Sequence, residues 1–269
     1  MRKLGVCLAL LLSMATTANA ANCPATTSEQ VEIYPTAEVL PENLLRMYVY
    51  FPRSMGIDEG LRNVHLLDDN GVVIDGVFLT NRVDLWSVDQ RRLTLVLDPG
   101  RVKTGLKAHD QLGRALAVDQ SYTLLVSGSA MDAEGCAIGD DARHRFSVEA
   151  PDNVAPAPSQ WVISTPEAST LQPLTIDLGS PHDHVSLAYR IRVLDSDGAI
   201  LPGKIMLGSG ESTWNFIPRR PWSSTGYSVM IDGTLEDLAG NRPGRLFDSP
   251  SAQTQLDWIN HLHFAPRAP

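Results

Sequence analysis

Two pairs of histidines have a spacing that could bind a metal ion. One residue separates His182 from His184, and one separates His261 from His263. On an extended strand, residues two apart face the same side, so both imidazoles of a pair could reach one copper or zinc ion. The spacing fixes no third ligand, which a metal site needs. A periplasmic copper- or zinc-binding protein is therefore one alternative function, and exposed histidines of a loop and an edge strand are the simpler interpretation.

The most basic segment of the chain could bind an anion or an acidic partner. It follows the predicted strand at residues 93–97 and has no counterpart in the second half of the sequence. Its candidate binding residues are Arg101, Lys103, Lys107 and Arg114. Long loops on a rigid β framework often carry function. The alternative is a connecting loop whose Leu106 and Leu112 cap the end of the first domain.

No sequence motif points to catalysis. The chain contains no G-x-S-x-G, H-E-x-x-H, P-loop or G-x-G-x-x-G pattern. Paired acids such as Asp68 and Asp69 stand beside glycines and are typical of turns. We therefore predict no catalytic residue and no enzymatic activity. An unrecognised hydrolase is a second alternative, because catalytic triads are defined by geometry and not by sequence order.

The N-terminus predicts export. Arg2 and Lys3 precede a short apolar stretch at residues 7–14, and residues 18–20 (ANA) resemble a cleavage site. This pattern is typical of a secretory signal peptide at residues 1–20 and is too short for a membrane span. We expect a periplasmic or cell-surface protein that does not span the membrane. The whole chain has a net charge of −9, and losing Arg2 and Lys3 makes it more negative. That charge argues against nucleic acid and anionic membranes as partners.

Cysteine usage agrees with export. Cys7 leaves with the signal peptide, and Cys23 and Cys136 remain as a pair. In an oxidising compartment such a pair predicts one disulfide. Closing a loop of this length is worth about 4–5 kcal/mol in the chain-entropy account. A lipid anchor at Cys23 and two free thiols are the alternatives.

The remaining sequence contains an internal repeat. Residues 66–71 (LLDDNG) return as residues 193–198 (VLDSDG), and residues 122–126 (YTLLV) return as residues 227–231 (YSVMI). Period-two alternation, as in residues 93–97 and 174–178, predicts short half-buried strands between turn residues. The pattern predicts an all-β protein with two tandem Ig-like β-sandwich domains. We place the domains at residues 31–149 and 159–250, joined by a Pro-rich linker at 150–158. The C-terminal segment at 251–269 either adds an edge strand through Leu262 and Phe264 or forms a loose tail.

Two short motifs resemble a known family. Residues 50–55 (YFPRSM) follow a predicted strand, and residues 235–241 (LEDLAGN) follow the strand at 227–231. They are similar to the bacterial Ig-like domain of the surface-layer-protein type, with its F-S-x-P-M step and its DLAGN turn. Each half departs at one motif: the first has DAEGC at 132–136, and the second has GSPH at 179–182. The resemblance implies exported spacer or interaction modules and does not imply a catalytic centre.

The turn motif also has a simple physical interpretation. Asp237 can accept hydrogen bonds from amides of its own turn, while Gly240 or Asn241 adopts a positive φ. Glu236 and Asp237 alone supply too few oxygens for calcium. The sequence therefore predicts an exported, non-enzymatic binding or structural spacer module of the cell envelope, without a cofactor. Its partner would be an unknown protein or envelope component.

Overall fold

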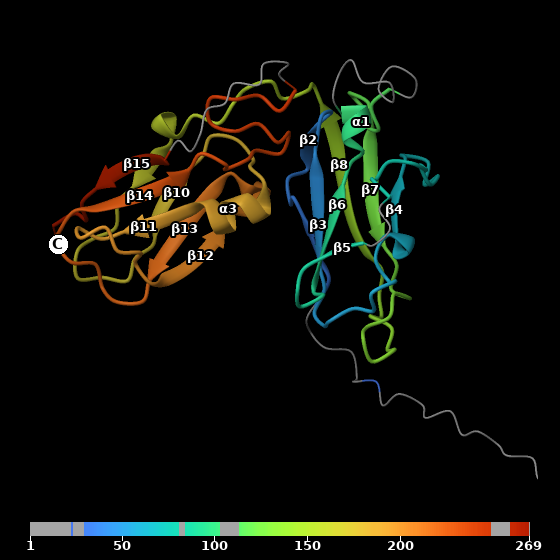
Figure 1. Ribbon diagram of the computed structural model, residues 1–269, viewed down its shortest axis with the longest axis horizontal. Helices are drawn as coiled ribbons and strands as arrows, with labels where there is room; N and C mark the ends of the chain where they lie inside the picture. The colour runs from blue at the N-terminus through green and yellow to red at the C-terminus, as the bar shows by residue number, and fades with distance from the viewer. Residues whose placement is uncertain (1–22, 24–29, 81–83, 103–112, 249–258, 269) are drawn as a thin grey trace, which may run out of the picture.

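Strands dominate the protein. The computed structural model describes residues 23, 30–80, 84–102, 113–248 and 259–268. We call residues 30–149 the first half and residues 159–268 the second half. Figure 1 shows the strands of the two halves as separate groups that lie side by side. The predicted all-β class is confirmed in this coarse form, since the helices in the described residues are short.

The first half contains two four-stranded sheets. One has the order β1-β3-β6-β5, and the other has the order β2-β8-β7-β4. Their bounds are β1 Glu32–Tyr34, β2 Val39–Pro41, β3 Arg46–Tyr50, β4 Val64–Leu67, β5 Leu85–Trp86, β6 Arg92–Val96, β7 Ser121–Val126 and β8 Ala142–Glu149. Neighbouring strands are antiparallel except for β2 and β8, which run parallel.

The second half contains a four-stranded and a three-stranded sheet. Their orders are β12-β13-β10-β9 and β11-β14-β15, and all pairs are antiparallel. The bounds are β9 Val162–Ser164, β10 Leu174–Asp177, β11 Ile191–Leu194, β12 Gly203–Leu207, β13 Thr213–Pro218, β14 Tyr227–Asp232 and β15 Ile259–Phe264.

Short helices connect the strands. In the described ranges, the α-helices are α1 Pro99–Val102 and α3 His184–Arg190, and the 3-10 helices are η1 Leu61–Asn63, η2 Pro158–Gln160 and η3 Ser209–Glu211. Helix α3 begins after Asp183, whose side chain accepts a hydrogen bond from the amide of Ser186 and so caps the helix. Among the described residues, no helix is long and apolar enough to cross a membrane.

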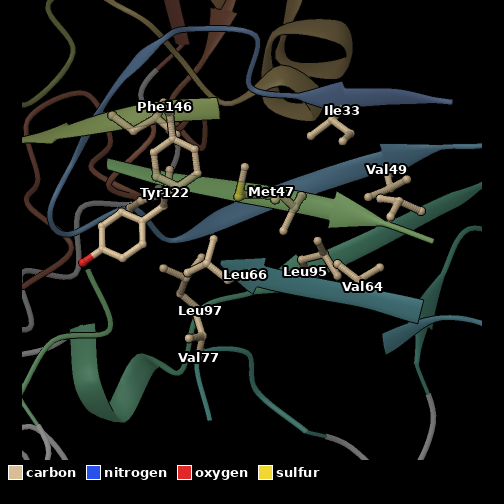
Figure 2. Packing of buried hydrophobic residues seen from close by; sticks show 14 of the residues in the cluster. Ile33, Met47, Val49, Val64, Leu66, Val77, Leu95, Leu97, Tyr122 and Phe146 are labelled. Atoms are coloured by element: carbon tan, nitrogen blue, oxygen red, sulfur yellow. The ribbon is translucent and has the colours of Figure 1, made fainter. Parts of the chain in front are cut away.

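Alternating apolar residues give each half its own core. β6, β7, β13 and β14 bury every second side chain, as expected for strands with one face against a core. In the first half, Met47 and Leu95 from one sheet pack with Leu66 and Phe146 from the other (Figure 2). The second half packs around Trp214. Each half is thus built from two sheets with a shared apolar layer.

Strand β3 departs from the predicted alternation. Met47 and Val49 belong to the core, but Tyr48 between them is only 3% exposed. Because successive side chains of a strand face opposite sides, Tyr48 lies on the outer face of its sheet. The sequence predicts a strand with one buried face. In the structure this part of β3 is buried on both faces, because the second half covers the outer face.

The C-terminal segment adds an edge strand. β15 pairs with β14 along its whole length, from Tyr227 opposite Phe264 to Asp232 opposite Ile259. Phe264 also belongs to the core of the second half. Of the two alternatives for residues 251–269, the edge strand through Leu262 and Phe264 is therefore the one observed.

Candidate functional site: a polar interface between the two halves

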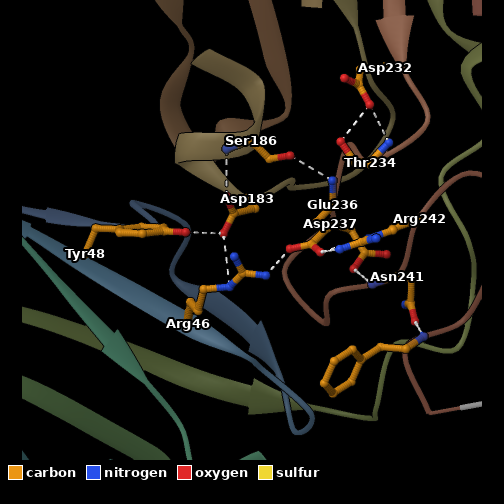
Figure 3. A network of polar contacts seen from close by, with 11 residues as sticks. Arg46, Tyr48, Asp183, Ser186, Asp232, Thr234, Glu236, Asp237, Asn241 and Arg242 are labelled. Atoms are coloured by element: carbon orange, nitrogen blue, oxygen red, sulfur yellow. Dashed lines mark hydrogen bonds and ion pairs between the residues drawn. The ribbon is translucent and has the colours of Figure 1, made fainter. Parts of the chain in front are cut away.

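The outer face of β3 meets the second half through charged and phenolic side chains. The Tyr48 hydroxyl donates to Asp183 Oδ2 at 2.7 Å. The Arg46 guanidinium pairs with Glu236 and lies 3.9 Å from Asp183 Oδ2. Figure 3 shows Arg46 and Tyr48 pointing from β3 toward these two carboxylates. Since Asp183 also caps α3 through Ser186, one carboxylate joins a strand of the first half to a helix of the second.

Burial sets the protonation of this cluster. Burial raises the pKa of Tyr48, and the neighbouring Asp183 raises it further, so the phenol keeps its proton and donates it. Burial also raises the pKa of Asp183, while Arg46 and the Tyr48 hydrogen bond act against that rise. Glu236 accepts from Arg46 through one oxygen and from Arg242 Nε and Nη2 through the other, the latter at 2.9 and 2.6 Å. The buried charges are therefore paired, as buried charges must be to be tolerated.

A second polar contact surrounds Glu211, which is 1% exposed. Its carboxylate accepts from the backbone amide of Thr36 at 2.7 Å and from the Thr36 hydroxyl at 3.1 Å. In return, the amide of Gly210 donates to the Thr36 hydroxyl at 2.8 Å. His184 lies between the halves here, with Nδ1 3.5 Å from Glu211 and its ring centroid 3.6 Å from that of Tyr34. Both halves thus supply groups to one interlocked set of hydrogen bonds.

The linker between the halves is also fixed at both sides. Asn43 donates to the Asp152 carbonyl at 2.8 Å and accepts from its amide at 2.8 Å. From the second half, Asn241 donates to the same carbonyl at 3.2 Å. The amide of Leu45 donates to the carbonyl of Leu238 at 2.9 Å, and the Leu238 side chain joins the core of the first half. These contacts join Asp152 of the linker to both halves, as expected for a linker with a fixed conformation.

The DLAGN turn forms as its sequence predicts. Asp237 Oδ1 accepts from the amides of Ala239 and Asn241, both at 2.9 Å, and Gly240 has a φ of +79°. A turn motif is expected at the solvent, but here Glu236, Asp237 and Leu238 are all buried. In the sequence, only Leu238 indicates that this turn is buried, because a large apolar side chain within a tight turn needs a surface to pack against.

The four candidate metal-binding histidines lie in three environments. His182 is 1% exposed, and its Nδ1 donates to the carbonyl of Ser180 at 2.9 Å. His184 begins α3 and lies at the Glu211 contact. His261 and His263 are exposed on β15 with ring centroids 6.3 Å apart, so this pair shares a face. Within the described part of the chain, no three His, Cys, Asp or Glu side chains are placed to hold a metal ion.

The candidate basic residues are in part structural. Arg101 donates to the carbonyls of Gly113 at 2.9 Å, Gly76 at 2.9 Å and Arg114 at 3.0 Å. Arg114 forms an ion pair with Glu42 at 2.5 Å. These contacts hold the two ends of the basic segment against the first half. Lys103 and Lys107 lie outside the described residues, so the segment as an anion site stays a prediction.

The predicted disulfide is confirmed. Cys23 and Cys136 are bonded, with their Cα atoms 5.5 Å apart and a sequence separation of 113. Cys136 is buried at the end of the turn at residues 132–136, which belongs to the first half. The bond therefore attaches residue 23 to that turn.

Comparisons with known proteins give only weak likenesses. No protein-family model and no curated protein matches the chain. Among solved structures, native alpha-2-macroglobulin from Escherichia coli is 10% identical, with a TM-score of 0.28, and the match covers 77% of this chain and 67% of that one. The N-terminal Ig1-2 module of the Drosophila receptor protein tyrosine phosphatase DLAR is 12% identical, with a TM-score of 0.25, over 90% of this chain and 100% of that one. Scores this low carry no conclusion about this protein.

Proposed function

We propose that the protein is an exported, non-enzymatic module of the cell envelope. In this proposal two tandem Ig-like β-sandwich domains form one rigid unit that serves as a structural spacer or binding module. The observation that carries the proposal is the polar interface, because Arg46 and Tyr48 of the first half are paired with buried carboxylates of the second. A partner protein or envelope component would bind the outside of this unit.

Matching strand orders support two tandem copies. The order β5-β6-β3-β1 in the first half corresponds to β12-β13-β10-β9 in the second, in the same chain sequence. The order β4-β7-β8 likewise corresponds to β11-β14-β15. Strand β2 has no counterpart among the described strands of the second half. In this correspondence β15 is the last strand of the second copy, so that copy extends through the segment at 259–264 and beyond the predicted boundary at residue 250.

Equivalent tyrosines support an Ig-like fold for both copies. The Tyr122 hydroxyl, at the start of β7, accepts from the amide of Ala117 at 3.1 Å. The Tyr227 hydroxyl, at the start of β14, accepts from the amide of Ser223 at 3.0 Å. A tyrosine that bonds back to the backbone a few residues upstream is the tyrosine corner of Ig-like sandwiches. Both copies have it on corresponding strands.

Equivalent turns support the same conclusion. In the first copy Asp68 Oδ1 accepts from the amides two and four residues later, and in the second copy Asp195 does the same. Asp132 and Asp237 repeat this pattern in a second turn. Each turn carries glycine at its third position after the aspartate, with φ between +77° and +80°. The repeated sequence motifs thus correspond to repeated hydrogen bonds.

Rigidity can be tested by measuring the distance between the halves. Val88 in the first half and Ile200 in the second are exposed and suit spin labels after Val88→Cys and Ile200→Cys substitution. Double electron–electron resonance should give one narrow distance distribution. Arg46→Ala should broaden it, because Glu236 and Asp183 would lose a buried partner. Arg190→Ala, which removes an exposed ion pair with Asp232 inside the second half, is the matched control and should leave it narrow.

Two outcomes would contradict the rigid unit. A broad distribution in the otherwise unsubstituted protein would show that the halves move independently. An unchanged distribution in Arg46→Ala, with both halves folded by near-UV circular dichroism, would show that the polar interface does not position them.

Export is tested separately by fractionating the native cells. The proposal expects a periplasmic or surface protein that lacks residues 1–20, and an unprocessed cytoplasmic protein would refute it.

A further inference from the structure

A small pocket with an excess of arginine lies between the halves. Its volume is about 170 Å³, and Leu45 and Arg46 from the first half line it together with Glu236, Arg242 and Arg245 from the second. Three arginines and one glutamate are therefore among the residues that line the pocket. Asp183, which is outside the lining, lies 3.9 Å from Arg46, so one positive charge remains unbalanced at the pocket, in a chain whose net charge is −9.

The backbone places two of these arginines side by side. Arg242 and Arg245 exchange both backbone hydrogen bonds at 2.8 Å across a turn with Pro243 and Gly244 at its tip. Gly244 has a φ of +73°, which suits a Pro-Gly turn. Residues directly opposite in such a pair point their side chains to the same face. Like charges so placed repel, and a bound anion would remove that repulsion.

The pocket carboxylate is already engaged. One Glu236 oxygen accepts from Arg242 at 2.9 and 2.6 Å, and the other pairs with Arg46, as Figure 3 shows. Within the described residues, the exposed Arg245 side chain makes no hydrogen bond or ion pair. Its guanidinium is thus available to a ligand, next to the Arg46 and Arg242 guanidiniums that pair with Asp183 and Glu236.

We propose that this pocket binds a phosphoryl group, with Arg245 as the principal contact and Arg46 and Arg242 completing the charge. A phosphate group would supply the negative charge that Arg245 lacks, and arginine forks bind phosphate oxygens through charge-assisted hydrogen bonds. Because Arg46 belongs to the first half, the ligand would contact both halves. The proposal does not depend on the envelope role proposed above. Free phosphate and a phosphorylated lipid headgroup present the same chemistry.

Inorganic phosphate is the first probe. Purified mature protein is titrated with phosphate against chloride at constant ionic strength, and amide shifts are followed by NMR. Saturable shifts are expected at residues 242–247. Arg245→Gln should weaken binding about tenfold, the usual effect of losing one charged hydrogen bond. Arg220→Gln removes an equal charge from an exposed site elsewhere in the second half and should leave the affinity unchanged. Because both arginines are exposed, both variants should fold.

A second arm distinguishes the sources of the phosphoryl group. Vesicles of phosphatidylcholine with and without phosphatidic acid are sedimented with the protein. Arg245-dependent co-sedimentation with phosphatidic acid would indicate a lipid headgroup, and its absence with retained phosphate binding would indicate a soluble ligand. Either result supports the pocket. Non-saturable shifts with phosphate, or equal weakening by Arg245→Gln and Arg220→Gln, would overturn the proposal, because general charge screening would then explain the effect.

Discussion

The turn at residues 132–136 and the turn at residues 237–241 have the same backbone and different electrostatics. In each, the aspartate Oδ1 accepts hydrogen bonds from two amides of the turn. Each aspartate also forms an isolated β-bridge with an earlier residue, Asp132 with Met55 and Asp237 with His182. The turn needs only the first carboxylate oxygen. The comparison teaches that the turn does not constrain what surrounds the second carboxylate oxygen, Oδ2. The surroundings of Oδ2 differ between the halves.

The first turn has a cation for that oxygen, and the second has none among the described residues. Arg53 Nε lies 2.9 Å from Asp132 Oδ2. Asp237 Oδ2 and His182 Nε2 are buried and have no hydrogen-bond partner in the part of the chain that the structure describes. Burial raises the pKa of Asp237 to about 7, and the nearby charge of Asp152 contributes to the rise. The aspartate of the turn thus lies beside an arginine in the first half, and in the second half burial raises the pKa of its counterpart.

The largest expected difference comes from replacing each aspartate by asparagine. Asparagine keeps the Oδ1 acceptor, so the turn can form in both variants. Asp132→Asn leaves Arg53 with no carboxylate in a mostly buried position and should lower the free energy of unfolding by about 3 kcal/mol at pH 8. Asp237→Asn removes an unpaired buried charge and should leave stability equal or higher at that pH. Urea denaturation of the two variants measures both values, and equal losses would show that the second oxygen does not matter.

The pH dependence of stability sharpens the comparison. The folded-state pKa of Asp237, about 7, lies above its ordinary value of 3.8, so the folded protein holds this proton more tightly than the unfolded chain. The contribution of Asp237 to the free energy of unfolding is therefore fully present below pH 4 and is lost as the pH rises through about 7. Relative to Asp237→Asn, the unsubstituted protein should lose at most about 1.4 kcal/mol per pH unit in this window. Denaturation midpoints between pH 4 and 8 measure the difference, and parallel curves would contradict it.

The two turns also show what sequence can and cannot predict. The Asp and Gly spacing of each turn predicts its hydrogen bonds, because these depend on residues within the turn. The alternation of β6 and β14 is equally local. The disulfide is predictable because only two cysteines remain once the predicted signal peptide is removed. The burial of Tyr48, Glu236 and Asp237 depends on which surfaces meet between the halves. No residue near them in sequence carries that information, apart from the apolar Leu238.

The smallest expected effect comes from exchanging the residues opposite the turns. His182 occupies the position of Met55, and both side chains are almost fully buried. His182→Met removes the unpaired Nε2 but also the bond to Ser180, so stability at pH 8 should change by less than about 1.5 kcal/mol. Burial lowers the pKa of His182, so the histidine costs stability as the pH falls through 6.5 and the unfolded chain gains a proton. His182→Met should therefore unfold at lower pH than the unsubstituted protein, and the reciprocal Met55→His should unfold at higher pH. Acid titration followed by tryptophan fluorescence compares the three, and identical midpoints would show that the residue opposite the turn has no electrostatic role.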